Sequence, residues 1–234
     1  MGNYLETFYS RNEQGEDNYP QQLCDHLVEQ WLGGASAVRG KKLLDIGSGK
    51  GNHLIGFARR GMETYGIDKR SECLGALDQF DIRDCDIESE PFPFEDGFFD
   101  YVYSKSVLEH VTNTDNFLAQ ALRVLKPGGT ALIMTPDWKS QHTYFWDDYT
   151  HVRAFTRKSL QNAMIINGFN QVKCDYFLQL PMVWKHPWVE PFTRLVALLP
   201  DSLRWKDAEE KEFRRLIRFS KERMLISSGR KTAT

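Results

Sequence analysis

Cysteine is scarce in this 234-residue chain. The four cysteines (Cys24, Cys73, Cys85 and Cys174) lie far apart in the sequence, and no two of them form a C-x-x-C pair. This spacing excludes a disulfide framework and a cysteine zinc site, and it predicts free thiols in a reducing compartment. A chain of this length can bury a sizeable core without such cross-links.

Long apolar runs and an excess of one charge are also missing. No window approaches 18 apolar residues, and residues 1–20 lack the apolar core of a signal peptide, so we predict a cytoplasmic protein without a membrane span. The 30 basic and 32 acidic residues give a net charge of -2. This balance counts against a nucleic-acid binder, whose affinity would come largely from basic groups on phosphates.

Short apolar segments alternate with helical patterns along the chain. Strands are expected at 43–47, 63–68, 80–85, 98–105, 130–135, 172–178 and 224–229, and helices from 19 to 32, up to 58, around 117–125 and at 157–166. This order predicts an α/β fold: a doubly wound, mostly parallel seven-stranded sheet with helices on both faces. Within a single domain we expect an N-terminal arm and helix (1–40), a core (41–180), an inserted lid or interface (181–222), and a last strand with a tail (223–234).

The most informative segment is a glycine loop between the first strand and its helix. Gly47, Gly49 and Gly51 follow the strand, and glycines there allow a tight turn and close approach of a ligand. The loop fits neither common nucleotide motif. A dinucleotide fingerprint requires glycine or alanine where Asn52 stands, and a P-loop requires serine or threonine where Gly51 follows Lys50.

Four ordered blocks resemble class I (Rossmann-like) S-adenosylmethionine-dependent methyltransferases, especially members that act on small molecules or in glycan clusters. The blocks are the loop at 43–53, the segment at 86–100, the Leu-Glu-His segment within 106–111, and the Leu-Lys-Pro-Gly-Gly turn within 123–129. Together they span about residues 43–137.

The resemblance implies S-adenosylmethionine as the cofactor and assigns residues to its parts. Gly47, Gly49, Gly51 and Asp45 would serve the methionine part, with Ser104 beside its ammonium group. Asp68, which lies 19 residues after Gly49, would hold the ribose diol, and the next residue, Lys69, would also belong to the cofactor site. Asp86 and the backbone of Ile87 would bind adenine, with Asp84 as the alternative acidic contact.

The segment after the fifth strand is expected to meet the acceptor. Its mixture of aromatic, carboxylate and imidazole side chains suits a polar, ring-bearing small molecule or glycan, so O-methylation is the leading interpretation. His151 and His142 are the candidate general bases. Alternatively, His151 and Asp148 fix the loop by hydrogen bonds, and His110 orders the loop after strand four. Asp147, Asp148 and His151 could together hold a metal ion, but we predict no metal site.

Other functions and partners remain as alternatives. The fold also suits a non-catalytic cofactor-binding module or, with less support, an RNA methyltransferase. Residues 204–231 contain ten Lys/Arg against five Asp/Glu and follow an apolar stretch at 188–199. We expect this stretch to pack on the core as a lid or to contact a second subunit in a homodimer. The alternative is peripheral contact with an anionic membrane.

Overall fold

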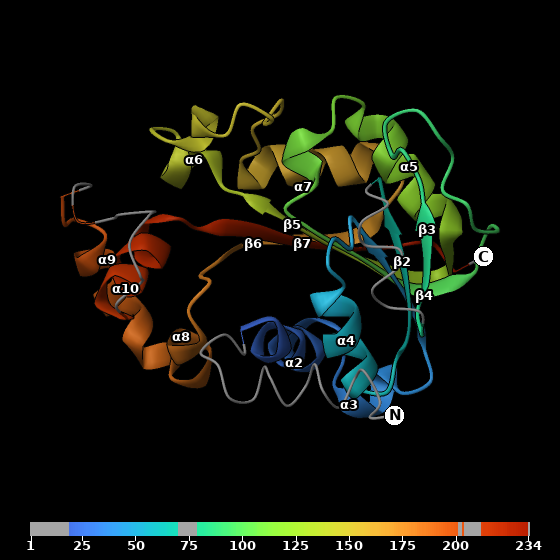
Figure 1. Cartoon of the computed structure of the whole chain (residues 1–234), viewed down its shortest axis with the longest axis horizontal. Coiled ribbons are helices and arrows are strands. Elements are labelled where there is room, and N and C mark those ends of the chain that lie inside the picture. Colours follow the sequence, from blue (N-terminus) through green and yellow to red (C-terminus); the bar gives the residue numbers. More distant parts are fainter. Residues whose placement is uncertain (1–18, 70–78, 201–202, 204–211, 234) are drawn as a thin grey trace.

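The strands form one seven-stranded sheet through the middle of the molecule (Figure 1). The computed structural model describes residues 19–69, 79–200, 203 and 212–233. The strand order is β3-β2-β1-β4-β5-β7-β6. The strands are β1 (Lys42–Ile46), β2 (Glu63–Asp68), β3 (Asp81–Asp84), β4 (Phe99–Lys105), β5 (Leu125–Pro136), β6 (Asn170–Phe177) and β7 (Met224–Arg230). The α/β fold with a seven-stranded sheet is therefore confirmed. Residues 1–18 of the predicted N-terminal arm and residues 204–211 of the basic C-terminal segment lie outside the described residues.

Helices cover both faces of this sheet (Figure 1). The first face carries α5 (Thr114–Val124) and α7 (Arg157–Ile166), and the second carries α2 (Tyr19–Trp31), α3 (Ala35–Val38) and α4 (Asn52–Arg59). Leu43 and Leu44 show why the strands are apolar throughout. Leu43 packs in the core on the α2 and α4 side, whereas its neighbour Leu44 packs in the core on the α5 and α7 side. Successive strand residues point to opposite faces, so both must be apolar.

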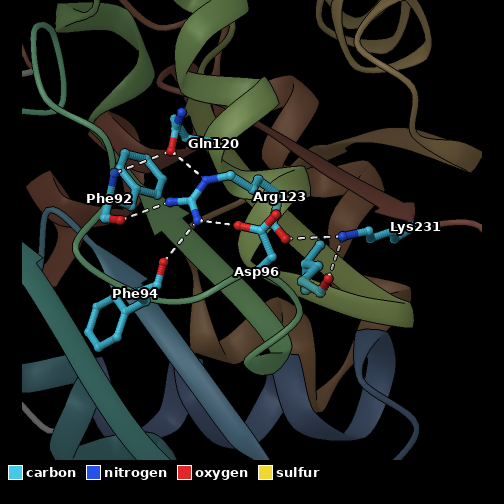
Figure 2. Close-up of polar contacts among 7 residues, drawn as sticks. Phe92, Phe94, Asp96, Gln120, Arg123 and Lys231 are labelled. Atoms are coloured by element: carbon cyan, nitrogen blue, oxygen red, sulfur yellow. Dashed lines mark hydrogen bonds and ion pairs between the residues drawn. The ribbon is translucent and has the colours of Figure 1, made fainter.

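Strand β5 begins five residues earlier than the sequence indicates. The expected break at Pro127, Gly128 and Gly129 lies inside the strand, because the chain is already extended at Leu125, which pairs with Phe99. The glycines instead accompany a register shift between β4 and β5. Lys231 stabilises this junction: its ammonium group donates to the carbonyl of Arg123 at 3.0 Å and to that of Leu125 at 2.7 Å (Figure 2).

Strand β7 makes the sheet mixed. It pairs antiparallel with both β5 and β6, while the other described pairs are parallel. The described helices between β6 and β7, which are α8 (Pro181–Lys185), α9 (Glu190–Val196) and α10 (Glu212–Lys221), lie near the end of the sheet where β6 finishes, and β7 starts there and runs back (Figure 1). A connection that returns at the same end of a sheet produces an antiparallel neighbour.

The inserted segment contains α8 (Pro181–Lys185), the 3-10 turn η4 (Pro187–Val189), α9 (Glu190–Val196) and α10 (Glu212–Lys221). Leu178 and Leu180, just before the segment, and Val183 in α8 form a small buried cluster that packs against residues of α10. The outer side of the segment carries what we call the exposed apolar row, whose side chains are 56–80% exposed: Trp188, Phe192, Leu195 and Leu198. The expectation that residues 188–199 pack on the core is therefore wrong for these four side chains. None of the described helices has the length and apolar character needed to cross a membrane.

Candidate active site

The glycine loop links β1 to α4 and adopts the backbone that only glycine accommodates easily. Gly47, Gly49 and Gly51 have φ values of 75°, 51° and 74°, in the left-handed region where other residues are strained. A Cβ on Gly47 would lie 2.3 Å from Cγ2 of Val107, in the loop after β4. A Cβ on Gly49 would meet no atom within 4 Å. The loop is therefore packed against the β4 loop at Gly47 and open at Gly49.

Asp68 joins the glycine loop to the end of β2. The Gly49 backbone N–H donates to Oδ2 of Asp68 at 2.8 Å. Lys69, the next residue, donates from its ammonium group to Oδ2 of Asp86 at 2.9 Å, and this bond holds the pKa of Asp86 below its usual value. Ile87 is half-buried against the core. The predicted ribose and adenine residues are thus brought together at one end of the sheet. Asp84 pairs in register with Asp68, so it lies at the same end.

Asp45 lies beneath this loop and has an unusual ionisation. It is 1% exposed, and burial, followed by the negative charge of Asp68, raises its pKa to about 8. Its Oδ2 has no hydrogen-bond partner among the described residues. Burial lowers the pKa of Lys105, which lies at the end of β4. The positive charge of Lys105 in turn opposes the rise in the pKa of Asp45. A buried acid with an unpaired oxygen fits a cationic ligand such as a sulfonium or ammonium group.

Ser104 and Ser106 shape the end of β4. The Ser104 hydroxyl is fully buried and donates to the Ile46 carbonyl at 3.2 Å, so this side chain ties β4 to β1. Ser106 has a φ of 57°, which is strained for a residue with a Cβ. Its N–H donates to the Met134 carbonyl of β5. The role of Ser104 beside the cofactor ammonium stays a prediction.

Arg123 fixes the loop that leads into β4 (Figure 2). Its guanidinium donates to the carbonyls of Phe92 and Phe94 at 2.8 and 2.9 Å, and to Oδ1 of Asp96 at 2.7 Å. On the α5 side, the same group donates to Oε1 of Gln120 at 2.9 Å. A guanidinium presents five donors in a rigid plane, so one side chain can hold several backbone carbonyls at once. This loop follows the predicted adenine contacts, and sequence reasoning did not identify Arg123 as its anchor.

His151 lies in the linker after β5, beside the loop after β4. Its Nδ1 is 2.6 Å from the Phe145 carbonyl, and its Nε2 is 3.9 Å from Oδ2 of Asp148. The His151 ring centroid is 4.8 Å from that of His110, whose Nδ1 is 3.2 Å from the Thr150 carbonyl. The two histidines therefore connect the β4 loop with the linker after β5.

Glu109 completes this group and was missed as a site residue. It lies in the 3-10 turn η2 (Leu108–His110), is 1% exposed, and accepts a hydrogen bond from the Thr135 hydroxyl at 2.9 Å. Burial raises the pKa of its carboxyl group. The sequence did hold one indication of this group. Glu109 and His110 come shortly after the fourth strand, and His151 comes after the fifth, so all three lie at the carboxyl ends of neighbouring strands.

His142 lies apart from these histidines. It ends the short helix α6 (Trp138–Gln141), is exposed, and has its Nδ1 3.3 Å from the carbonyl of Lys139 in its own turn. Its ring centroid is 6.3 Å from that of Trp138, and Trp138 also contacts the half-exposed Trp146. His142 is thus part of an aromatic surface rather than of the buried group.

Comparison with known proteins identifies the family. A family described as "Methyltransferase domain" matches residues 16–173, more than half of the sequence. The chain belongs to this methyltransferase family. The resemblance to S-adenosylmethionine-dependent class I methyltransferases is thereby confirmed, and family membership implies S-adenosylmethionine as the methyl donor.

Individual relatives in this family carry different names. The chain is 33% identical over 126 residues to a ubiquinone biosynthesis O-methyltransferase of Dechloromonas aromatica, which covers 50% of this chain and 53% of that protein. It is 31% identical over 148 residues to phosphoethanolamine N-methyltransferase 2 of Caenorhabditis elegans, covering 58% of this chain and 34% of that protein. The chain spans about half or less of the length of such curated relatives.

Among solved structures, a putative methyltransferase from Haloferax volcanii, in complex with the Trm112 methyltransferase activator, has a TM-score of 0.67 at 18% identity. The match covers 95% of this chain and 94% of that chain. At this identity the likeness concerns the fold.

Proposed function

We propose that the protein transfers a methyl group from S-adenosylmethionine to a hydroxyl of a small-molecule or glycan-type acceptor. The observation that supports this most is the position of the loop after β4. Val107 of this loop contacts the glycine loop at Gly47, and two residues later Glu109 and His110 meet His151. One short loop thus borders both the proposed cofactor site and a group of side chains able to act on a proton.

The reaction needs alignment and, for a hydroxyl acceptor, removal of one proton. The bond between sulfur and the methyl carbon breaks, its electron pair stays on sulfur, and the acceptor oxygen forms the new bond to carbon. Alignment of such reactants supplies about 7–11 kcal/mol. A positioned base adds about 10²–10⁴-fold in rate.

His151 is the better placed of the two predicted bases. The Phe145 carbonyl can only accept a hydrogen bond, so it fixes the proton of His151 on Nδ1 and leaves Nε2 able to take the acceptor proton. His142 is the second candidate, and its neighbours Trp138 and Trp146 suit stacking against a ring-bearing acceptor.

The experiment is a turnover assay with labelled S-adenosylmethionine and a panel of phenol, sugar and amine acceptors. Replacing His151 by Ala should lower turnover about 10²-fold or more while cofactor affinity stays the same, because this side chain acts on the acceptor. His186→Ala is the matched control, since His186 is exposed and lies beside Trp188 in the inserted segment. Methylation of amines alone would overturn the assignment to oxygen.

A further inference from the structure

Three side chains that can bind a metal ion converge beside the proposed acceptor site. One carboxylate oxygen of Glu109 and one ring nitrogen each of His110 and His151 all lie within 4.8 Å of one another. Glu109 and His110 come from the loop after β4, and His151 comes from the linker after β5. Because β4 and β5 are parallel neighbours, their carboxyl ends bring the three residues together.

The two imidazoles are oriented as metal ligands usually are. Nδ1 of His151 faces the Phe145 carbonyl, and Nδ1 of His110 faces the carbonyl and hydroxyl oxygens of Thr150 at 3.2 and 3.0 Å. The Thr150 hydroxyl donates its own hydrogen to Asp148, so it can accept one from His110. Both Nδ1 atoms therefore carry a hydrogen, and both Nε2 atoms keep a lone pair. Metal-binding histidines almost always donate their second ring N–H in this way.

Glu109 supplies the negative charge of the group. Its side chain is nearly fully buried, and it accepts a hydrogen bond from the neutral Thr135 hydroxyl. Burying a carboxylate costs free energy unless a cation lies beside it, so this position favours a bound ion.

We propose that Glu109, His110 and His151 bind one divalent transition-metal ion. Two imidazoles and one carboxylate favour ions such as Mn²⁺ or Zn²⁺ over Mg²⁺ and Ca²⁺, which prefer oxygen ligands. Ligands about 2.1 Å from an ion are at most about 4.2 Å apart, so the longest separation must shorten by roughly half an ångström. Asp148, 3.9 Å from Nε2 of His151, offers a further oxygen.

The ion's chemical role rests on the proposed function, whereas its binding does not. An ion held by three protein ligands keeps open positions, and a hydroxyl bound there loses its proton more readily. With an ion bound, Nε2 of His151 would be a ligand, so the proton of an ion-bound acceptor hydroxyl would pass to water and not to His151. This proposal replaces the sequence-based expectation that the protein holds no metal.

The test measures metal binding directly, without cofactor or acceptor. The full chain is treated with a chelator, dialysed and titrated with Mn²⁺, with free Mn²⁺ followed by electron paramagnetic resonance. Zn²⁺ binding is measured by competition with a chromogenic chelator. We expect one saturable equivalent. His110→Ala and His151→Ala should weaken binding at least 10–100-fold, the loss seen for residues that only support a ligand. His186→Ala should bind as the unaltered chain does.

The outcomes separate this proposal from the proposed function. No saturable binding of either ion, or binding unchanged in His110→Ala and His151→Ala, would overturn the metal site. Cofactor binding measured on the same samples reports independently on the methyltransferase site. Glu109→Gln keeps the volume of the buried side chain. Its loss of metal binding with an unchanged thermal transition would confirm the carboxylate as a ligand.

Discussion

Asp45 should make the free energy of unfolding of the protein depend on pH, and replacing this one residue should remove that dependence. In the folded protein this buried acid keeps its proton up to about pH 8, whereas in the unfolded chain an aspartic acid loses its proton near pH 4. Between these values the folded state binds one more proton than the unfolded state. The free energy of unfolding must therefore fall as pH rises through this window.

The magnitude follows from the same values. Each pH unit inside the window costs about 1.4 kcal/mol, so Asp45 should lower the free energy of unfolding by about 2 kcal/mol between pH 6.5 and pH 8. His53 acts in the opposite direction at lower pH, because burial lowers its pKa to about 3. Its contribution rises with pH and is nearly complete at about pH 6.5, where half of the unfolded imidazoles have lost their proton; only about 0.4 kcal/mol remains to be gained at higher pH. Between pH 6.5 and pH 8 the Asp45 term is therefore the larger of the two, and the remaining His53 term is common to the unaltered chain and to an Asp45 variant.

The assay is urea unfolding at pH 6.5, 7.25 and 8 for the unaltered chain and for Asp45→Asn, which cannot ionise. Glu95→Gln serves as the control, because it also removes one acidic group but at an exposed position. Between pH 6.5 and pH 8, the free energy of unfolding of the unaltered chain and of Glu95→Gln should fall by about 2 kcal/mol more than that of Asp45→Asn. Equal slopes for Asp45→Asn and the unaltered chain would show that Asp45 is already ionised at pH 6.5.

Three further predictions concern the cofactor site and the inserted segment. Asp68→Ala should weaken S-adenosylmethionine binding by about 1.5–3 kcal/mol in calorimetry, because it removes a charged acceptor; an unchanged dissociation constant would refute its role. Gly47→Ala should destabilise the protein by about 1–3 kcal/mol, and less so in a Val107→Ala background, where the clashing methyl group is gone; equal losses in thermal unfolding would reject the steric explanation. If the exposed apolar row meets an anionic membrane, the chain should float with anionic vesicles in a salt-sensitive manner; absence of binding leaves contact with a second subunit.

Local sequence patterns predicted most of the fold, because element type follows from apolar periodicity. Helix α7 has the predicted bounds, and Thr156 caps it through a reciprocal hydrogen bond with Ser159. The start of β5 was missed, because proline and glycines ordinarily break a strand. Here Gly128 adopts a positive φ, and Lys231 bonds to carbonyls that lie more than 100 residues earlier in the sequence. Both features allow the strand to continue.

The candidate site was predictable where its residues lie within one motif. The glycine loop and Asp68 belong to such a motif, and the structure joins them by the Gly49 hydrogen bond. The burial of Glu109 and its proximity to His151 depend on how β4 and β5 pair, which no local pattern specifies. The exposure of the apolar row is likewise a tertiary property, since a periodic apolar stretch looks the same whether it is covered or not.

Methyl transfer itself is the most direct test of the proposed function. The full chain, incubated with S-adenosylmethionine labelled in its methyl group and a panel of hydroxyl-bearing aromatic and sugar acceptors, should place the label on an acceptor oxygen, as identified by mass spectrometry and NMR. The label transfer should be reduced in Asp68→Ala, through weaker binding of S-adenosylmethionine, and strongly reduced in His151→Ala. Tight binding of S-adenosylmethionine with no label on any acceptor, or label found only on nitrogen or carbon, would contradict the proposal.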